Sequence, residues 1–166
     1  MSPIHYQTMA RYNAWANGQV FDAAARLPDD AYRAARPAAY FGSLHGTLNH
    51  VLVVDLLWFA RLDGSRVGPL RLDQILHDDL AALRAARAGE DARIVALVDA
   101  LDEEALAKER DFKDTRGDSR SMPVWQILAT VFNHQTHHRG QAHALLKDAG
   151  LEPPSLDLPV YLRSVN

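Results

Sequence analysis

The strongest constraint on the fold of this chain is the spacing of its apolar residues. Four long segments repeat apolar residues at three- and four-residue intervals, which is the pattern of an α-helix that buries one face. Almost no segment shows the apolar–polar alternation of a strand. We predict helices at residues 4–26, 43–63, 73–101 and 122–150. Four helices of this length indicate an all-α fold, a four-helix bundle.

The signals at the helix ends agree with these limits. Ser43 is a favourable N-cap for the second helix, and Gly64 follows its last residue. Residues 48–62 are apolar on nearly every side, so we expect this helix to be buried against more than one neighbour. Pro123 precedes the fourth helix and Gly150 ends it. Arginines and acids alternate in residues 84–93, which predicts a solvated outer face on the third helix.

The remaining segments carry weaker patterns. Residues 102–121 lie between the third and fourth helices, and a turn at residues 115–118 predicts a possible small hairpin there. Residues 151–166 contain three prolines, and we expect them to cross the bundle as an irregular strap.

Length and composition limit the class of protein. The chain has 166 residues, which predicts a single domain over residues 1–166. It has 18 Lys and Arg against 21 Asp and Glu, a net charge of −3, so it lacks the basic footprint of a nucleic-acid or anionic-membrane partner. The absence of cysteine excludes disulfides, thiolate zinc sites and cysteine nucleophiles. With neither a signal-peptide pattern nor a membrane-length apolar run, we expect a cytoplasmic protein.

Histidine is the residue type that points to chemistry. The chain has eight histidines, four of them within residues 134–143. At about 100° per residue, His134 and His138 fall within roughly 40° of each other on the apolar stripe of the fourth helix. His137 falls on the rim of that stripe, and His143 falls on the opposite face. His50 lies on the apolar stripe of the second helix.

Histidines at positions i and i+4 place two imidazoles side by side, which is how one helix supplies two ligands to a metal ion. His50 is the best candidate for a third ligand. Three neutral imidazoles that leave coordination positions open are typical of a catalytic metal site. A single inward histidine is more often a hydrogen-bonded core residue. Three in register favour a metal, because burying them without partners would leave polar groups unmet.

Four sequence pieces resemble the DinB/YfiT-like family, which includes metal-dependent enzymes. They are Tyr12–Asn17, Leu48–Trp58, Asn133–Gln141 and Asp157–Arg163. The resemblance implies a metal-binding triad of His50, His134 and His138. It also implies a four-helix bundle with up-down-down-up topology, in which a long crossover joins two parallel helices. Relatives often form homodimers and bind nickel or zinc. Some are transferases or isomerases that use a small cellular thiol, and many have no assigned reaction.

The acidic residues help to separate the possible reactions. The fourth helix has no carboxylate between Pro123 and Lys147, and the chain lacks both HExxH and Glu-x-x-His motifs. The sequence therefore argues against a zincin protease and excludes a ferritin-like site. Hydrolysis would need a general base, such as Asp55 or a carboxylate of the C-terminal tail. The missing base favours metal-assisted activation of a thiol, which a soluble cosubstrate must supply because the chain has no cysteine.

Several further residues have predicted roles. Asn13 either lines the site or ties the first helix to a neighbour. We expect Gln141 to reach the site, Arg139 to form a structural ion pair, Gly140 to allow close helix approach and Trp58 to wall the pocket. A second apolar patch on the fourth helix needs cover, and a homodimer is the preferred interpretation. The patch consists of Trp125, Leu128 and Phe132.

Three functions remain open. The first is an enzyme acting on a small molecule, a thiol-dependent transferase or a hydrolase, with a divalent metal held by three histidines. The second is a non-catalytic metal-binding or stress-response (damage-inducible) protein that keeps the fold. The third, a metal-free helical binding module, agrees least with the histidine pattern.

Overall fold

Four long helices form the body of the molecule. The structure, a computed structural model, describes residues 2–37 and 39–165. Residues 1, 38 and 166 of the predicted 1–166 domain lie outside the described residues. The long helices are α1 (Pro3–Ala24), α3 (Leu44–Asp63), α4 (Leu80–Asp99) and α6 (Val124–Asp148). Helix α1 packs against α4 and α6, and α3 packs against the same two helices. The predicted four-helix bundle is thus confirmed.

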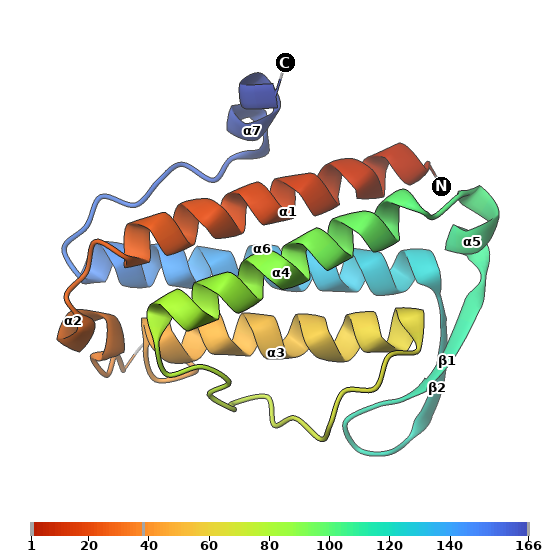
Figure 1. The fold of residues 1–166 in the computed structure, drawn as a ribbon, viewed down its shortest axis with the longest axis horizontal. Helices are drawn as coiled ribbons and strands as arrows, with labels where there is room; N and C mark the ends of the chain where they lie inside the picture. Colours follow the sequence, from red (N-terminus) through yellow and green to blue (C-terminus); the bar gives the residue numbers. More distant parts are fainter. Residues whose placement is uncertain (1, 38, 166) are drawn as a thin grey trace.

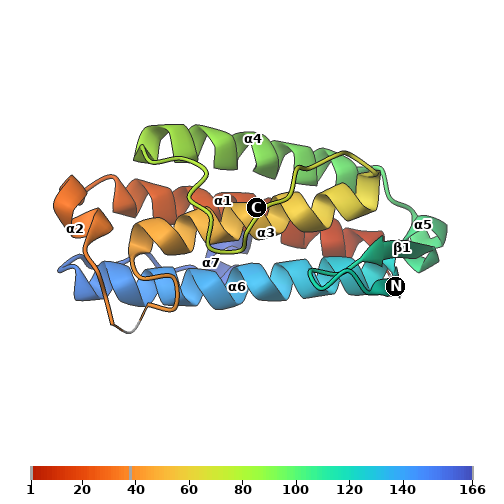
Figure 2. The same cartoon turned by 90° about the horizontal axis from the view of Figure 1, so that it is seen from below.

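The helix directions confirm the predicted topology. Helix α1 runs one way, α3 and α4 both run the other way, and α6 returns in the direction of α1 (Figure 1). The parallel pair, α3 and α4, is joined by residues 64–79, which run back along α3 (Figures 1 and 2). The order is therefore up-down-down-up, with a long crossover.

The crossover corrects the predicted start of the third helix. We expected a helix from residue 73, but α4 begins at Leu80, where the Asp79 side chain accepts a hydrogen bond from the amide of Ala82. Because α3 and α4 are parallel, the chain must first return along the whole of α3, a distance of about 30 Å. Residues 73–79 are used for this return. The side-chain oxygen of Asn49 holds them by accepting hydrogen bonds from the amides of Leu76 and His77.

The predicted ends of α3 are confirmed. The Ser43 hydroxyl accepts a hydrogen bond from the amide of Gly46, and Gly64 ends the helix with a φ of 75°. Such a left-handed residue favours glycine. Helix α3 is buried along most of its length and contacts α4, α6, α2 (Asp29–Arg33) and the hairpin. Its apolar character on nearly every side therefore reflects several packing partners.

The hairpin is present, whereas the tail differs from its prediction. Strands β1 (Glu109–Lys113) and β2 (Ser119–Pro123) pair antiparallel around the expected turn, after a short helix α5 (Glu103–Ala107) that we did not predict. The tail ends in another helix, α7 (Leu158–Val165), so it is irregular only over residues 151–157. Tyr161 anchors α7 by packing against Tyr12 and Trp15 of α1.

The core of the bundle contains two large apolar clusters with a polar layer between them, and a third, small cluster joins α7 to α1. One cluster centres on Phe59, Ile94 and Ile127, and the other on Leu52, Leu83 and Leu146. On each long helix, buried polar residues occupy the turns between the two clusters. These residues are Asn13 and Asn17 of α1, Asp55 of α3, Arg87 and Asp91 of α4, and Gln135 and Arg139 of α6.

This layer corrects two predictions. Residues 84–93 are not a wholly solvated face, because Arg87 is only 2% exposed and pairs with Asp55 at 2.7 Å and Asp91 at 2.9 Å. Arg139 has the expected structural role, but the groups that it contacts are uncharged. It donates to the side-chain oxygens of Asn13 and Gln135 and forms no ion pair among the described residues. Charged residues on a helix predict a solvent-exposed face. Their burial is tolerated only where residues of other helices pair with them.

The second apolar patch of α6 is covered within the chain. Leu128 is fully buried, Phe132 is 4% exposed, and both belong to one apolar cluster with Tyr6 and Ala10 of α1. Trp125, the third member of the patch, is partly buried and packs against the same cluster. The patch therefore gives no support for a homodimer, which remains a prediction from the family resemblance alone. None of the helices in the described ranges combines the length and apolar content needed to span a bilayer.

Candidate metal centre

The structure brings the three predicted histidines together. His50 comes from α3, and His134 and His138 lie on successive turns of α6. One candidate ligand nitrogen from each ring lies within 4.8 Å of the other two, and the ring centres are 4.3–5.1 Å apart. His50 and His138 are buried, and His134 is partly buried. These are the residue types and the spacing that a divalent transition metal requires.

The cluster lies at the margin of the core. We expected the rings to meet in the interior, but Asp55 and Gln135 of the polar layer occupy fully buried positions there. The histidines face segments that connect the helices. The ring of Phe41 stacks on His50, and the backbone of Leu72 from the crossover contacts the same ring. This position allows a cavity to reach the cluster.

Hydrogen bonds define which nitrogen two of the rings can offer to an ion. The Nδ1 of His50 donates to the carbonyl oxygen of Leu72 at 2.7 Å. The Nδ1 of His138 donates to Oε1 of Gln141 at 2.8 Å. Both partners are acceptors, so each Nδ1 carries the proton and each Nε2 keeps its lone pair. Metal-ligating histidines are commonly oriented in this way.

The contact between His50 and His134 tests whether the residues fit a metal ion. Their Nε2 atoms are 3.1 Å apart, although Nε2 of His50 has no proton to donate once its Nδ1 is bonded to Leu72. Two imidazole nitrogens that each lie about 2.0–2.1 Å from one ion are roughly 3.0–3.4 Å from each other. The Nδ1 of His134 is buried and lacks a hydrogen-bond partner among the described residues. The donor set therefore fits a divalent ion.

The protonation state also fits. Burial lowers the pKa of His50 to about 4, and burial together with the neighbouring rings lowers the pKa of His134 to about 3. Burial lowers the pKa of His138 as well. The rings are thus neutral near pH 7, and only neutral imidazole can bind a metal.

A close backbone approach places Phe41 over the cluster. The rings of Phe41 and His50 are stacked, with centres 3.7 Å apart and planes 17° apart. Gly46 makes this packing possible, because a Cβ at residue 46 would lie 2.1 Å from the backbone oxygen of Phe41. Sequence reasoning missed Phe41, Leu72 and Gly46. Only the glycine close to the N-cap offered a signal, and it did not reveal which segment packs there.

A cavity of about 260 Å³ borders on His50 and His134. Trp58 lines it as predicted, and Phe112 of β1 forms a second aromatic wall. Polar side chains from α3 and the hairpin also reach it, namely Arg61, Asp114 and Thr115. These residues were not singled out from the sequence, because the hairpin meets α3 only in the folded chain.

The other predicted site residues take varied positions. Gln141 reaches His138 as expected. Asn13 ties α1 to its neighbours, since it hydrogen-bonds Arg139 and Asp91. Asp55 is fully buried and bonded to Arg87 and Gln135, so it is not available as a general base.

Two predictions about neighbouring residues of α6 have different outcomes. His137 is exposed, as expected for a rim residue. Its ring packs edge to face on His138, and its Nε2 accepts a hydrogen bond from the side-chain amide of Gln141. The prediction for Gly140 is wrong. Beyond its own stretch of α6, a Cβ at that position would meet no atom of the described residues within 4 Å, so none of the other described helices approaches it closely.

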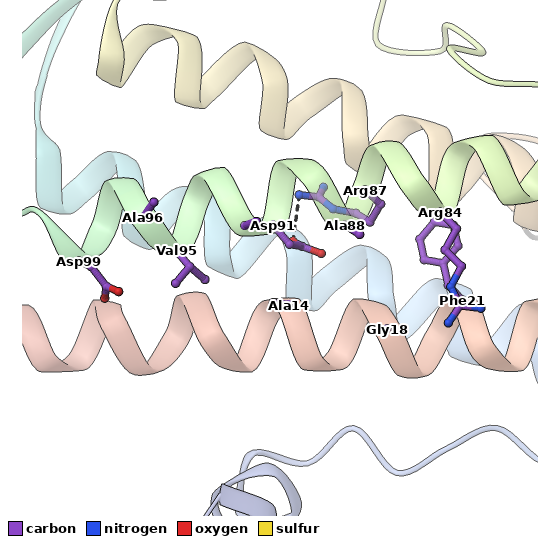
Figure 3. Close-up of a pocket in the computed structure, with 11 residues that line it drawn as sticks. Ala14, Gly18, Phe21, Arg84, Arg87, Ala88, Asp91, Val95, Ala96 and Asp99 are labelled. Carbon is purple, nitrogen blue, oxygen red and sulfur yellow. Dashed lines mark ion pairs between the residues drawn. The ribbon is translucent and has the colours of Figure 1, made fainter.

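A larger groove of about 600 Å³ lies elsewhere, between α1 and α4 (Figure 3). Small residues such as Ala14, Gly18 and Ala88 line it. Its four charged residues are all in ion pairs: Arg87 with Asp91, Arg84 with Asp22, and Asp99 with Arg11. No histidine is among its lining residues in the described helices. The groove offers no chemistry comparable with that of the three-histidine cluster.

Comparison with known proteins agrees with the fold. A sequence model of the DinB family matches residues 1–165. Protein DinB of Bacillus subtilis (strain 168) is 27% identical over 164 residues, covering 91% of this chain and 90% of that protein. A DinB-like protein from Bacillus cereus ATCC 10987 has a similar crystal structure, with a TM-score of 0.65, 20% identity and coverage of 84% of this chain and 89% of that one. A DinB-like protein of Bacillus subtilis, YjoA, gives a TM-score of 0.62 at 17% identity, with 90% and 97% covered.

Proposed function

The chain belongs to the DinB family, and from this premise we propose that it is a metal-dependent, thiol-using transferase. His50, His134 and His138 would hold one divalent ion, nickel or zinc, and the reaction would involve a small molecule and a soluble thiol. The observation that carries the proposal is the pair of Nε2 atoms 3.1 Å apart, one of them on a ring whose other nitrogen is already bonded to Leu72. The separation is the one expected of two ligands of a single ion, and Nε2 of His50 presents a lone pair at that point.

The structure favours a thiol reaction over hydrolysis because the nearby carboxylates are engaged. Asp114 is the acid that lines the cavity. Its carboxylate accepts hydrogen bonds from the amides of Arg116 and Asp118 and from the Arg120 side chain. These bonds lower its pKa, which makes it a weak general base. A bound divalent ion would supply Lewis acidity, lowering the pKa of a thiol that coordinates it.

The chain's own residues would orient and shield the reacting groups. Leu72 and Gln141 hold the rings of His50 and His138 with Nε2 available. Phe41, Trp58 and Phe112 place aromatic surface around the cluster and its cavity, which excludes water from that side. No cysteine is present in the sequence, so the thiol must come from solution.

Elemental analysis of protein purified without an affinity tag tests the metal part of the proposal. We expect about one nickel or zinc per chain. The variant His138→Ala should lose the ion and keep its helicity, because four long helices do not need a metal to form. The control His143→Ala removes a histidine of α6 that lies outside the cluster, and it should retain the ion. Fewer than about one ion in ten chains would contradict the proposal.

A panel of small thiols and electrophiles tests the catalytic part. Turnover should require both the metal and a thiol, disappear in His138→Ala and persist in His143→Ala. Full metal occupancy without metal-dependent turnover on a broad panel would contradict an enzyme. That outcome would favour the non-catalytic metal-binding or stress-response alternative.

A further inference from the structure

Arg61, in the last turn of α3, is held between two aromatic rings of the cavity. Its guanidinium carbon lies 4.4 Å from the ring centre of Trp58 and 4.9 Å from that of Phe112. The two rings pack edge to face, 5.5 Å apart. Stacking on aromatic faces restrains the planar guanidinium and leaves its N–H edge available.

Within residues 2–37 and 39–165, no side chain or backbone group pairs with the N–H groups of this guanidinium. Arg61 is partly buried, and among the residues that the structure describes it forms neither a hydrogen bond nor a salt bridge. Its electrostatic neighbour Asp114 is already bonded to Arg120. Other buried or partly buried arginines are paired, such as Arg87 with Asp55 and Arg93 with Glu90. The N–H groups of Arg61 are therefore free to bind an anionic ligand that enters the cavity.

The surroundings of Arg61 are locally basic. The cavity is continuous in its lining with an outer groove of about 810 Å³, since both contain Leu57, Arg61, Asp114 and Thr115. The outer groove adds Arg66 and Lys113. Its lining thus carries three cationic side chains against one acid, although the whole chain has a net charge of −3. A local excess of positive charge attracts anionic molecules.

Helix geometry connects this cation to the histidine cluster. Residues 50, 54, 57 and 61 follow one another at three- and four-residue steps, so they share one face of α3, and all four line the cavity. Arg61 lies about 16 Å along the helix axis from His50, a separation that its long side chain shortens. Val54 and Leu57 provide an apolar wall between them. A cavity of about 260 Å³ is near the lower limit for ligand sites, so its occupant is a small molecule.

We propose that Arg61 is a specificity-determining residue that binds a carboxylate of the substrate. The apolar carbon skeleton would lie against Val54, Leu57 and Trp58, with the reacting group near the histidines. The inference rests on the proposed function in placing the reaction at that cluster. A carboxylate is the anion of choice because its single charge balances one free guanidinium, and its two oxygens match the guanidinium fork.

Calorimetric titration with two probes of equal shape tests this assignment. The probes are 3-phenylpropionate and its neutral amide, 3-phenylpropanamide, each titrated into the full chain before and after metal removal by a chelator. We expect the carboxylate to bind about tenfold more tightly than the amide, the effect of one charge-assisted hydrogen-bonded pair. The preference should appear in both metal states, because it depends on Arg61.

Variants identify the residue responsible. Arg61→Gln should reduce the preference to less than about twofold, and Arg61→Lys should keep part of it, since a lysine retains the charge and loses the fork. The matched control Arg84→Gln makes the same charge change on α4, next to the other groove, and should leave the preference intact. Circular dichroism checks that each variant is folded.

Two results would overturn the inference. The first is seen in the wild type alone. Either it binds both probes with equal affinity, or it binds neither at millimolar concentration. The other is an unchanged preference in a folded Arg61→Gln. Failure of the proposed function would look different, because it would appear as missing metal or missing turnover while the carboxylate preference of the metal-free chain remained.

Discussion

The side-chain oxygen of Gln141 accepts a hydrogen bond from Nδ1 of His138 at 2.8 Å, one helical turn away on α6. The bond sets the tautomer in which Nε2 of His138 faces the other two rings. Gln141→Leu should therefore weaken metal binding about 10- to 100-fold, the usual effect of removing a group that orients a ligand. Competition with a chromophoric chelator measures the change.

Two controls separate orientation from general damage. Gln141→Glu keeps an acceptor oxygen and should restore most of the affinity. His137→Ala removes the exposed ring that contacts Gln141 from the other side and should change the affinity little. Equal losses in the Leu and Glu variants would show that Gln141 does not act through His138.

Gly46 is expected to be intolerant of even a methyl group. A Cβ there would lie 2.1 Å from the backbone oxygen of Phe41, and backbone cannot move away as a flexible side chain can. Gly46→Ala should lower the free energy of unfolding by about 1–3 kcal/mol, the range for overpacking, and displace Phe41 from His50. Urea unfolding measures the first effect.

The matched substitution at Gly140 should have the opposite sign. This glycine is also helical, and a Cβ there would meet no atom within 4 Å. Gly140→Ala should therefore stabilise the protein by roughly 0.4–1 kcal/mol. Similar effects of the two substitutions would contradict the packing of residue 41 against α3.

The pair formed by Arg87 and Asp55 should be far more sensitive than a surface pair. Both side chains are almost completely buried, so Arg87→Met leaves the Asp55 carboxylate without its cation. We expect a loss of about 3–5 kcal/mol in the free energy of unfolding. In the control Arg84→Met, the exposed pair with Asp22 is removed, and a change below about 1 kcal/mol is expected. Comparable losses would mean that the polar layer is not buried in solution.

Metal-free protein should lose stability in mild acid. The ordinary pKa of histidine is 6.5, but it is lowered to about 4 at His50 and about 3 at His134 in the folded chain. Below pH 6.5 the unfolded chain takes up protons that the folded chain does not, so unfolding becomes more favourable. The free energy of unfolding is therefore unaffected by these histidines above pH 6.5. It decreases as the pH falls from 6.5 toward the folded pKa values.

Comparison with a variant isolates the histidine contribution. The free energy of unfolding in urea is measured for wild type and His134→Gln between about pH 7.5 and pH 4.5. Carboxylates titrate in both proteins, so their effect cancels in the difference between the two curves. The free energy of the wild type should decrease more steeply with acid than that of the variant. Parallel curves would show that His134 is not held neutral by burial.

Local patterns were enough to predict the histidine triad and most of the helices. The spacing of His134 and His138 is a property of one helix, and the position of His50 on the apolar stripe of α3 is equally local. The caps at Ser43 and Gly64 depend on neighbouring residues alone. Each feature could be recognised because its physical cause lies within a few residues.

Features that depend on distant segments were missed. Leu72 meets His50 only because the crossover returns along α3, and Phe112 meets Arg61 only because the hairpin packs beside the end of that helix. The burial of Arg87 requires Asp55 from another helix. A helical pattern assigns charged residues to solvent, since it has no information about partners across the bundle.

Anomalous diffraction from crystals grown with nickel or zinc is the most direct test of the metal centre. We predict one strong peak, about 2.0–2.2 Å from Nε2 of His50, Nε2 of His138 and a ring nitrogen of His134, with further coordination positions left for small molecules. A peak bound only by other histidines, or no peak in this cluster at full metal concentration, would contradict a metal centre at these three residues.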